Sequence, residues 1–439
     1  MAREIYNGPE KRDYCDIVLQ TVGFYVAWNN LEESQGPKER KEVIDLNVAP
    51  LGLGIVFETR NQVRGYAEQL QRRIKYDPHL PVPKEEREYL EAHLRASLAY
   101  LTALNGYKQD FHHYVHETQQ VYPREFSEGE IGEAQSQVLQ MLHGLDYKGD
   151  FANAIGHFRE ENGLSESQIL GGVISAAEKF LPIIREYTGI DVDPTYRVIP
   201  VNINAPWRAW LKTERGEIIL EINLSHPEGW VRGQEERIGL HEVPIHGTQI
   251  ASWRQSSEAG IISPASCVTT LHTPEQISIE GLATSLPLIQ PELFPLTPFG
   301  KLSVKLDYLE RLVLHNAHIR ANLLSPLATR RERDEIVEYV VNHLPYMKFR
   351  DVRDRLERRS KDAVDRAYEL SYSEGARLHI ELFEQLGRNS ELFRRLVREE
   401  FLRPMTADQI RKFASQLREG KIREGNDISS TITPLATGL

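Results

Sequence analysis

Apolar residues recur at helical spacing along most of the chain. The clearest case is the segment 85–105, where an acidic first turn is followed by Leu, Ala and Tyr three or four positions apart. The same spacing predicts helices over 16–31, 60–75, 133–145, 165–188, 302–324, 332–343, 363–387 and 391–400, and the chain returns to helix after residue 233. The hydrophobic pattern therefore predicts a mostly α fold.

Two short runs rich in Val and Ile interrupt this helical pattern. Segments 196–204 and 217–224 read as strands separated by a polar stretch, which predicts a small β hairpin or ribbon beside a long helix. Residues 263–273 are rich in Ser and Thr and 287–299 in Pro, so both are expected to be loops. We expect a helical N-terminal lobe at 1–150, a catalytic lobe at 151–424 and a loose tail at 425–439.

The amino-acid composition and the net charge argue against several classes of protein. The 439 residues carry 53 Lys and Arg against 64 Asp and Glu, a formal net charge of −11, which argues against a broad nucleic-acid-binding surface. The sequence has no run of roughly 18 apolar residues that would span a membrane, and its first residues lack the apolar core of a signal peptide. Cys15 and Cys267 are too few for a disulfide framework. We therefore expect a cytoplasmic protein with reduced thiols.

The segment IGLHEVPIHGTQIASW holds the most informative residues, His241, Glu242 and His246. Two His four positions apart lie about 40° apart around an α-helix and can share one metal, whereas five positions give about 140°. A local widening of the helix to i→i+5 spacing would return both rings to one face, and such bulges concentrate at functional sites. Pro244 would disturb the helix at this point in any case.

These residue types suit zinc chemistry. Two neutral imidazoles and a carboxylate commonly hold Zn²⁺ and leave one position for water. Glu242 would then act as the general base that accepts a proton from the metal-bound water. Glu280, in SIEGLA, is the best candidate for the third ligand, at the point where a loop ends and an apolar run begins, and Glu275 is a weaker alternative.

The order of the motifs resembles that of the domain-of-unknown-function 885 family. Members are helical, predicted zinc metallopeptidases with a His-Glu-x-x-Pro-Gly-His-His type motif, a downstream Glu-Gly-Trp-Ala and a C-terminal Tyr-x-x-Gly. This chain has HEVPIHG at 241–247, EGLA at 280–283 and YSEG at 372–375, with an Ile-Asn-Leu strand end upstream at 222–224. The blocks match in order and spacing over roughly residues 215–400. The chain departs from the family by one residue fewer between Glu242 and His246, and by Leu282 in place of Trp.

The resemblance implies a gluzincin-type zinc hydrolase that cleaves a peptide or related amide. It supports His241, His246 and Glu280 as the ligands and Glu242 as the base. The His-Glu-x-x-x-His spacing also resembles that of the dipeptidyl-peptidase III family. In helical zinc peptidases a Tyr from a C-terminal segment often donates to the oxyanion, a role predicted here for Tyr372. Substrate contacts are predicted for Asn223, Arg320 and Arg377, since an Arg can bind a carboxylate bidentately.

Other interpretations remain open from the sequence. DFHHYVHE places His112 and His116, and also His113 and Glu117, four residues apart, so either pair could share a metal on a regular helix. The same scaffold could perform a non-peptidase reaction in small-molecule metabolism, or it could be a non-catalytic helical binding protein. The sequence leaves the oligomeric state open.

Overall fold

The computed structural model describes residues 9–35, 43–49, 54–80, 82–205, 207–214, 217–225, 229–325 and 327–421. The predicted tail at 425–439 lies outside these residues. The helices are α1 (Pro9–Ser34), α2 (Arg60–Tyr76), α3 (Lys84–Leu104), α4 (Phe111–Gln119), α5 (Glu128–Gly144), α6 (Phe151–Glu161), α7 (Glu166–Thr188), α8 (Gln234–Leu240), α9 (Thr248–Glu258), α10 (Gln276–Ile289), α11 (Pro298–Leu323), α12 (Arg330–His343), α13 (Phe349–Lys361), α14 (Asp365–Gln385), α15 (Ser390–Leu402) and α16 (Ala407–Arg418). A π-helical segment, η2 (His241–Gly247), joins α8 to α9, and a short 3-10 turn, η3 (Pro264–Cys267), follows.

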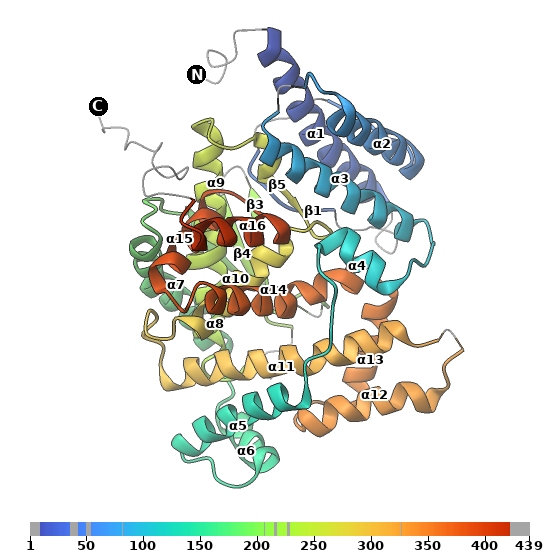
Figure 1. The fold of residues 1–439 in the computed structure, drawn as a ribbon. Coiled ribbons are helices and arrows are strands. Elements are labelled where there is room, and N and C mark those ends of the chain that lie inside the picture. Colours follow the sequence, from blue (N-terminus) through green and yellow to red (C-terminus); the bar gives the residue numbers. More distant parts are fainter. Residues whose placement is uncertain are drawn as a thin grey trace.

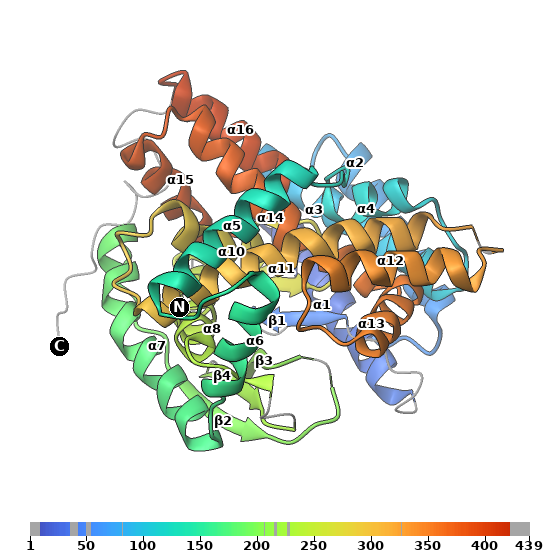
Figure 2. The same ribbon diagram turned by 90° about the horizontal axis from the view of Figure 1, so that it is seen from below.

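The prediction of a mostly α fold is confirmed (Figure 1). Helices α10 and α14 run through the middle of the molecule, with α1 to α3 at one end and α5, α6 and α11 to α13 at the other (Figures 1 and 2). One hydrophobic cluster joins α10 and α14 to α15 and α16 through residues such as Leu282, Leu370, Phe401 and Phe413. A second joins α5 and α6 to α11 and α12, so it spans the expected lobe boundary at residue 150.

The β structure is larger than the sequence predicted. Strands β2 (Tyr196–Val201) and β4 (Glu217–Asn223) match the two predicted strands, but they pair in parallel. The hairpin partner of β4 is β3 (Ala209–Glu214), in the stretch that the sequence left as a polar connection. β3 is an edge strand in which only Leu211 is buried, so its apolar signal is weak. A second small sheet pairs β1 (Ile44–Asn47) with β5 (Val268–Thr270), inside the predicted Ser/Thr loop.

Two glycines set the spacing of the central helices. A Cβ atom on Gly281 of α10 would lie 2.4 Å from the backbone of Gly375 in α14. A Cβ on Gly375 would lie 2.3 Å from the carbonyl oxygen of Ile277. Real side chains do not approach this closely, so only glycine at both positions allows the two backbones to touch. The EGLA and YSEG motifs are therefore the two sides of one helix contact.

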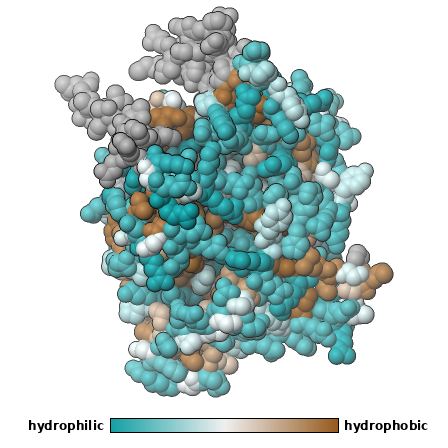
Figure 3. Space-filling model, in the orientation of Figure 1, coloured by the Kyte–Doolittle hydropathy of each residue, from teal (hydrophilic) through white to brown (hydrophobic). Residues whose placement is uncertain are grey.

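The surface in the orientation of Figure 1 is mostly hydrophilic (Figure 3). Apolar side chains project near the connection between α11 and α12, where Leu323 and Leu327 are exposed. Among the helices that the structure describes, none combines the length and the apolar character that crossing a bilayer requires.

We expect Gly375→Ala to lower the free energy of unfolding by about 3 kcal/mol, because the added methyl group must push α10 and α14 apart. Chemical denaturation followed by circular dichroism measures this change. Gly156→Ala is the matched control: Gly156 lies inside α6 with open space at its Cβ position, so this change should stabilise the chain by about 0.5–1 kcal/mol. Equal effects of the two substitutions would contradict a glycine-dependent helix contact.

Candidate metal centre

The helix that carries the HEVPIHG motif widens where the sequence predicted it. Residues His241–Gly247 form a π-helical segment between α8 and α9, and Pro244 lies inside it. The backbone N–H of Thr248 donates to the carbonyl of Val243, five residues earlier. Because the widened turn returns to the same face after about five residues, His241 and His246 point to one place. Their ring centroids are 4.6 Å apart and the rings are nearly perpendicular. The predicted helix widening is confirmed.

Glu280 lies in the middle of α10, not at the end of a loop as the sequence indicated. Nearly every residue of α10 is buried, its polar ones included, so the helix has no solvent-exposed face. A helix that is buried all round lacks the alternation of a polar and an apolar face on which the helix predictions relied, and its sequence reads as an interrupted apolar run. The Ser and Thr residues before it form η3, β5 and a turn. Because Glu280 lies within a helix, its backbone is held more rigidly than that of a loop residue.

Three donor atoms converge at this point. His241 Nε2 lies 3.0 Å from His246 Nε2 and 3.2 Å from Glu280 Oε2, and His246 Nε2 lies 3.6 Å from the same oxygen. Ligands about 2.0–2.2 Å from a tetrahedral zinc ion are separated by about 3.3 Å. The three measured separations bracket this value. Among the described residues, these are the one group of three or more His, Cys, Asp or Glu side chains with metal-binding geometry.

Hydrogen bonds orient the donors. His246 Nδ1 lies 3.3 Å from Gln249 Oε1, which can accept a hydrogen bond from Nδ1 in the neutral tautomer whose Nε2 faces the centre. The hydroxyl of Tyr368 donates to Glu280 Oε1 at 2.5 Å, so the other carboxylate oxygen, Oε2, faces the two histidines. Hydrogen bonds that hold the ligand side chains in this way are typical of protein metal sites.

Tyr372, the predicted oxyanion donor, lies next to Tyr368, which contacts Glu280. Its hydroxyl is 3.2 Å from that of Tyr368, one helical turn earlier in α14. The guanidinium of Arg311, from α11, stacks over the Tyr372 ring at 3.8 Å from the centroid. Neither Tyr368 nor Arg311 was predicted from the sequence. The i, i+4 spacing of Tyr368 and Tyr372 could have pointed to the first, whereas nothing local distinguishes Arg311 from the other arginines.

The electrostatics match a cation-binding site. Burial opposes a charged His246, but the hydrogen bond and charge of Glu280, together with the charge of Glu242, raise the pKa of His246 to about 9. Burial likewise opposes a charged Glu280, and the two histidines nevertheless hold the pKa of this carboxyl well below its usual range. Glu242 is half-buried next to the first ligand, as expected for the predicted base.

Three predicted substrate-binding residues have other partners. Asn223 is buried and its side-chain N–H groups donate to the carbonyls of Ile203 and Trp207, which fixes the loop after β2. Arg320 pairs with Glu125 on the surface. Arg377 pairs with Glu374 and stacks over Phe126. The structure therefore gives all three residues contacts that hold the fold together.

The alternative ligands are also placed elsewhere. The Glu275 carboxylate lies 2.7 Å from His93 Nε2 in a fully buried pair, away from the donor trio. In α4, His116 stacks on Tyr122 at 4.3 Å and lies 3.7 Å from Glu117. Across the described residues, the DFHHYVHE segment joins no three-ligand group.

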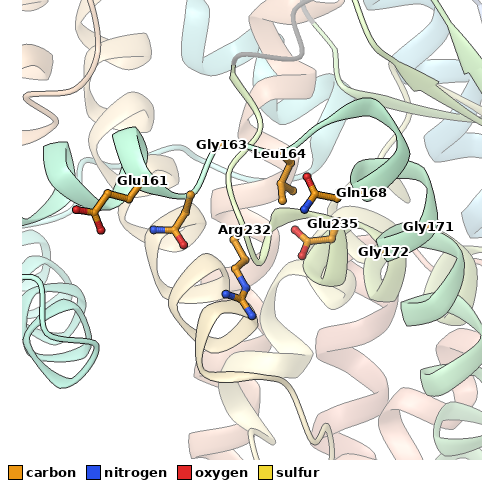
Figure 4. A pocket seen from close by; sticks show the side chains of 9 residues that line it. Glu161, Gly163, Leu164, Gln168, Gly171, Gly172, Arg232 and Glu235 are labelled. Atoms are coloured by element: carbon orange, nitrogen blue, oxygen red, sulfur yellow. The ribbon is translucent and has the colours of Figure 1, made fainter.

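A separate groove opens between the ends of α6, α7 and α8 (Figure 4). It has a volume of about 570 Å³, and Arg232, Glu235 and Gln168 stand around it. Glu235 accepts a hydrogen bond from the Gly233 backbone, and Gln168 completes the capping box of α7 with Ser165. Glu235 and Gln168 therefore stabilise the first turns of α8 and α7.

No family model matches the sequence, and no curated protein matches it either. The fold does have neighbours among solved structures. A protein from Colwellia psychrerythraea, provisionally described as a lipoprotein, has a TM-score of 0.55 at 15% identity, over 82% of this chain and 70% of that chain. Another from Shewanella oneidensis, provisionally described as a lipoprotein of unknown function, has a TM-score of 0.49 at 11% identity, over 80% and 71%. The first likeness shows a shared fold. The resemblance to the domain-of-unknown-function 885 family stays a prediction.

We expect purified protein to hold about one zinc per chain and to lose it in His241→Ala and in Glu280→Ala, because each change removes one of three ligands. Elemental mass spectrometry measures the content. His112→Ala and His116→Ala are the controls and should retain the metal. If zinc persists in both ligand variants, the metal is bound elsewhere, and the histidines of α4 are then the first candidates.

We also expect Tyr368→Phe to weaken zinc affinity about 10- to 100-fold without unfolding the chain, because Glu280 loses the hydrogen bond that orients its carboxylate. Competition with a fluorescent chelator measures the affinity. Tyr339→Phe is a suitable control, since Tyr339 contacts Asn316 away from the donors. Unchanged affinity in Tyr368→Phe would contradict an orienting role.

Proposed function

We propose that the protein is a zinc-dependent hydrolase that cleaves a peptide or related amide bond. The observation that carries the proposal is the convergence of His241, His246 and Glu280 at separations that suit tetrahedral zinc. The half-buried Glu242 directly follows the first ligand in the widened helix. This combination of three ligands and an adjacent carboxylate is the arrangement that metal-assisted hydrolysis requires.

Each residue then has a chemical role. When bound, zinc would polarise the substrate carbonyl and lower the pKa of water to about 7. Glu242 accepts the proton of the attacking water and returns it to the leaving nitrogen. The Tyr372 hydroxyl donates a hydrogen bond to the oxygen on which negative charge develops, a contribution of about 3 kcal/mol for one such donor. Tyr368 and Gln249 hold the ligands in place. The cytoplasmic location stays a prediction from the sequence.

We expect Glu242→Gln to reduce turnover of a cleaved peptide or amide by about 10²- to 10⁴-fold while the zinc content stays at the wild-type level, because the amide cannot accept a proton. A mass-spectrometric screen of a peptide library supplies the substrate, and rate measurements on both proteins give the ratio. Glu258→Gln, at the exposed end of α9, is the matched control.

Near-normal turnover in Glu242→Gln would count against general-base hydrolysis. A zinc-loaded wild-type chain that cleaves no peptide or amide would favour another metal-dependent reaction. A chain that binds no metal, even after zinc is supplied, would favour a helical binding protein.

A further inference from the structure

Three arginines lie near one another, and one of them, Arg311, stacks over Tyr372. Arg311 comes from α11, and Arg355 and Arg359 lie one turn apart on α13; we refer to them as the arginine cluster. Helix α13 packs against both α11 and α14, as the two ribbon views show (Figures 1 and 2). All three side chains are half-buried, with 23% of Arg311 and 14% of Arg359 exposed. Solvent therefore reaches a place where positive charge is concentrated.

Acidic side chains surround the cluster, but they form ion pairs with only some of its arginines; Glu310 and Asp365 lie near it without such a pair. Glu369 forms an ion pair with Arg359. Asp307 is shared between Arg311, at 3.5 Å, and Arg237, at 3.4 Å. Within the part of the chain that the structure describes, no carboxylate lies within ion-pairing distance of Arg355. The buried Nε of Arg359 likewise finds no hydrogen-bond partner among the described groups.

The arrangement is unfavourable for the two arginines of α13 only. Burial opposes a charged Arg311, but the charges of Asp307, Tyr372 and Glu369 raise the pKa of Arg311 above its ordinary value. Burial, followed by the positive charge of Arg355, lowers the pKa of Arg359 to about 9. Burial also lowers the pKa of Arg355, although nearby Glu369 opposes this shift. Half-buried like charges destabilise a fold unless an opposite charge joins them. The exposed arginines of the same helix differ, since Arg350 pairs with Asp354 four residues on and is 84% exposed.

One member of the arginine cluster, Arg311, is linked to the metal centre through two tyrosines. Arg311 stacks over Tyr372, the Tyr372 hydroxyl contacts that of Tyr368, and Tyr368 donates to Glu280. A molecule bound at the donor trio would therefore have two phenol rings and then the Arg311 guanidinium as neighbours, with Arg355 next to Arg311. Guanidinium groups bind carboxylate and phosphate oxygens bidentately, and half-buried ones do so most strongly.

We propose that Arg311, Arg355 and Arg359 form an anion-binding subsite beside the metal centre, and that the substrate carries a carboxylate or phosphate group there. The inference about the substrate rests on the proposed hydrolase function. The inference that the subsite binds an anion is independent of that function, because anion binding is measured without turnover. Carboxylate and phosphate groups both present anionic oxygens, in a planar and a tetrahedral arrangement respectively. Separate probes, succinate and inorganic phosphate, distinguish the two groups.

The test is isothermal titration of the zinc-loaded full chain with inorganic phosphate and, separately, with succinate at constant ionic strength. We expect binding of at least one probe by the wild type and a loss of 10-fold or more in affinity in Arg355→Gln. Arg350→Gln is the matched control on the same helix and should bind like the wild type. Any direct binding of the probe to zinc is common to all three proteins and cancels in the comparison.

A second readout separates binding from folding. Arg355→Gln removes a half-buried cation from a like-charged group, so its melting temperature without anion should equal or exceed that of the wild type, while the rise caused by the bound probe should disappear. Arg355→Lys keeps the charge without the bidentate geometry and should bind with intermediate affinity.

Tighter binding of succinate than of phosphate would identify a carboxylate substrate, and tighter binding of phosphate would identify a phosphorylated one. Equal affinity in Arg355→Gln and wild type, or binding of neither probe by the wild type, would overturn the proposal.

Discussion

The contact between α10 and α14 at Gly281 and Gly375 is the constraint on which the candidate site depends. With both helices at backbone contact, the side chains next to the glycines are brought into register. Glu280 directly precedes the first glycine, and Tyr372 lies three residues before the second. The hydrogen bond from Tyr368 to Glu280 spans this contact. A side chain at either glycine would separate the ligand from the tyrosines that orient it, so the same two residues serve packing and chemistry.

The π-helical segment supplies the other half of the site. A regular helix would turn His241 and His246 about 140° apart, so five-residue spacing is useful only where the helix is widened. The widened turn gives up regular hydrogen bonding, and Pro244 within it has no N–H to donate. The surrounding structure holds this geometry in place: Gly239 packs directly on α7, where a Cβ would meet Val173 at 2.6 Å, and Gly247 faces Ile218 of β4. The small sheet thus lies beside the widened helix, as the sequence led us to expect.

The sequence was most informative where the chemistry is local. The His241 and His246 spacing, Pro244 and the helix widening can all be read within seven residues, and the long amphipathic helices follow from their own periodicity. Glu280 was predicted from its residue type, although its helix was not, because a helix that is buried almost all round has no solvent-exposed polar face to mark it. The arginines present a different case. Arg377 and Arg311 look alike in sequence, and only the packing of α11 and α13 on α14 decides which guanidinium lies beside Tyr372. Similarly, β3 was missed because an edge strand buries little apolar surface.

A proton and a metal ion compete for the same three donors. In the metal-free chain the pKa of His246 is about 9, above its ordinary value of 6.5, because Glu280 and Glu242 stabilise the charged ring. The protonated ring therefore contributes stability that is complete below about pH 6.5 and is lost as the pH rises through about 9. Zinc requires the neutral ring, so binding must displace this proton, and apparent affinity must rise with pH over the same interval. The acidic residues that make the site attractive to a cation thus also stabilise the protonated ring, so that a proton and a cation compete for the same arrangement of donors.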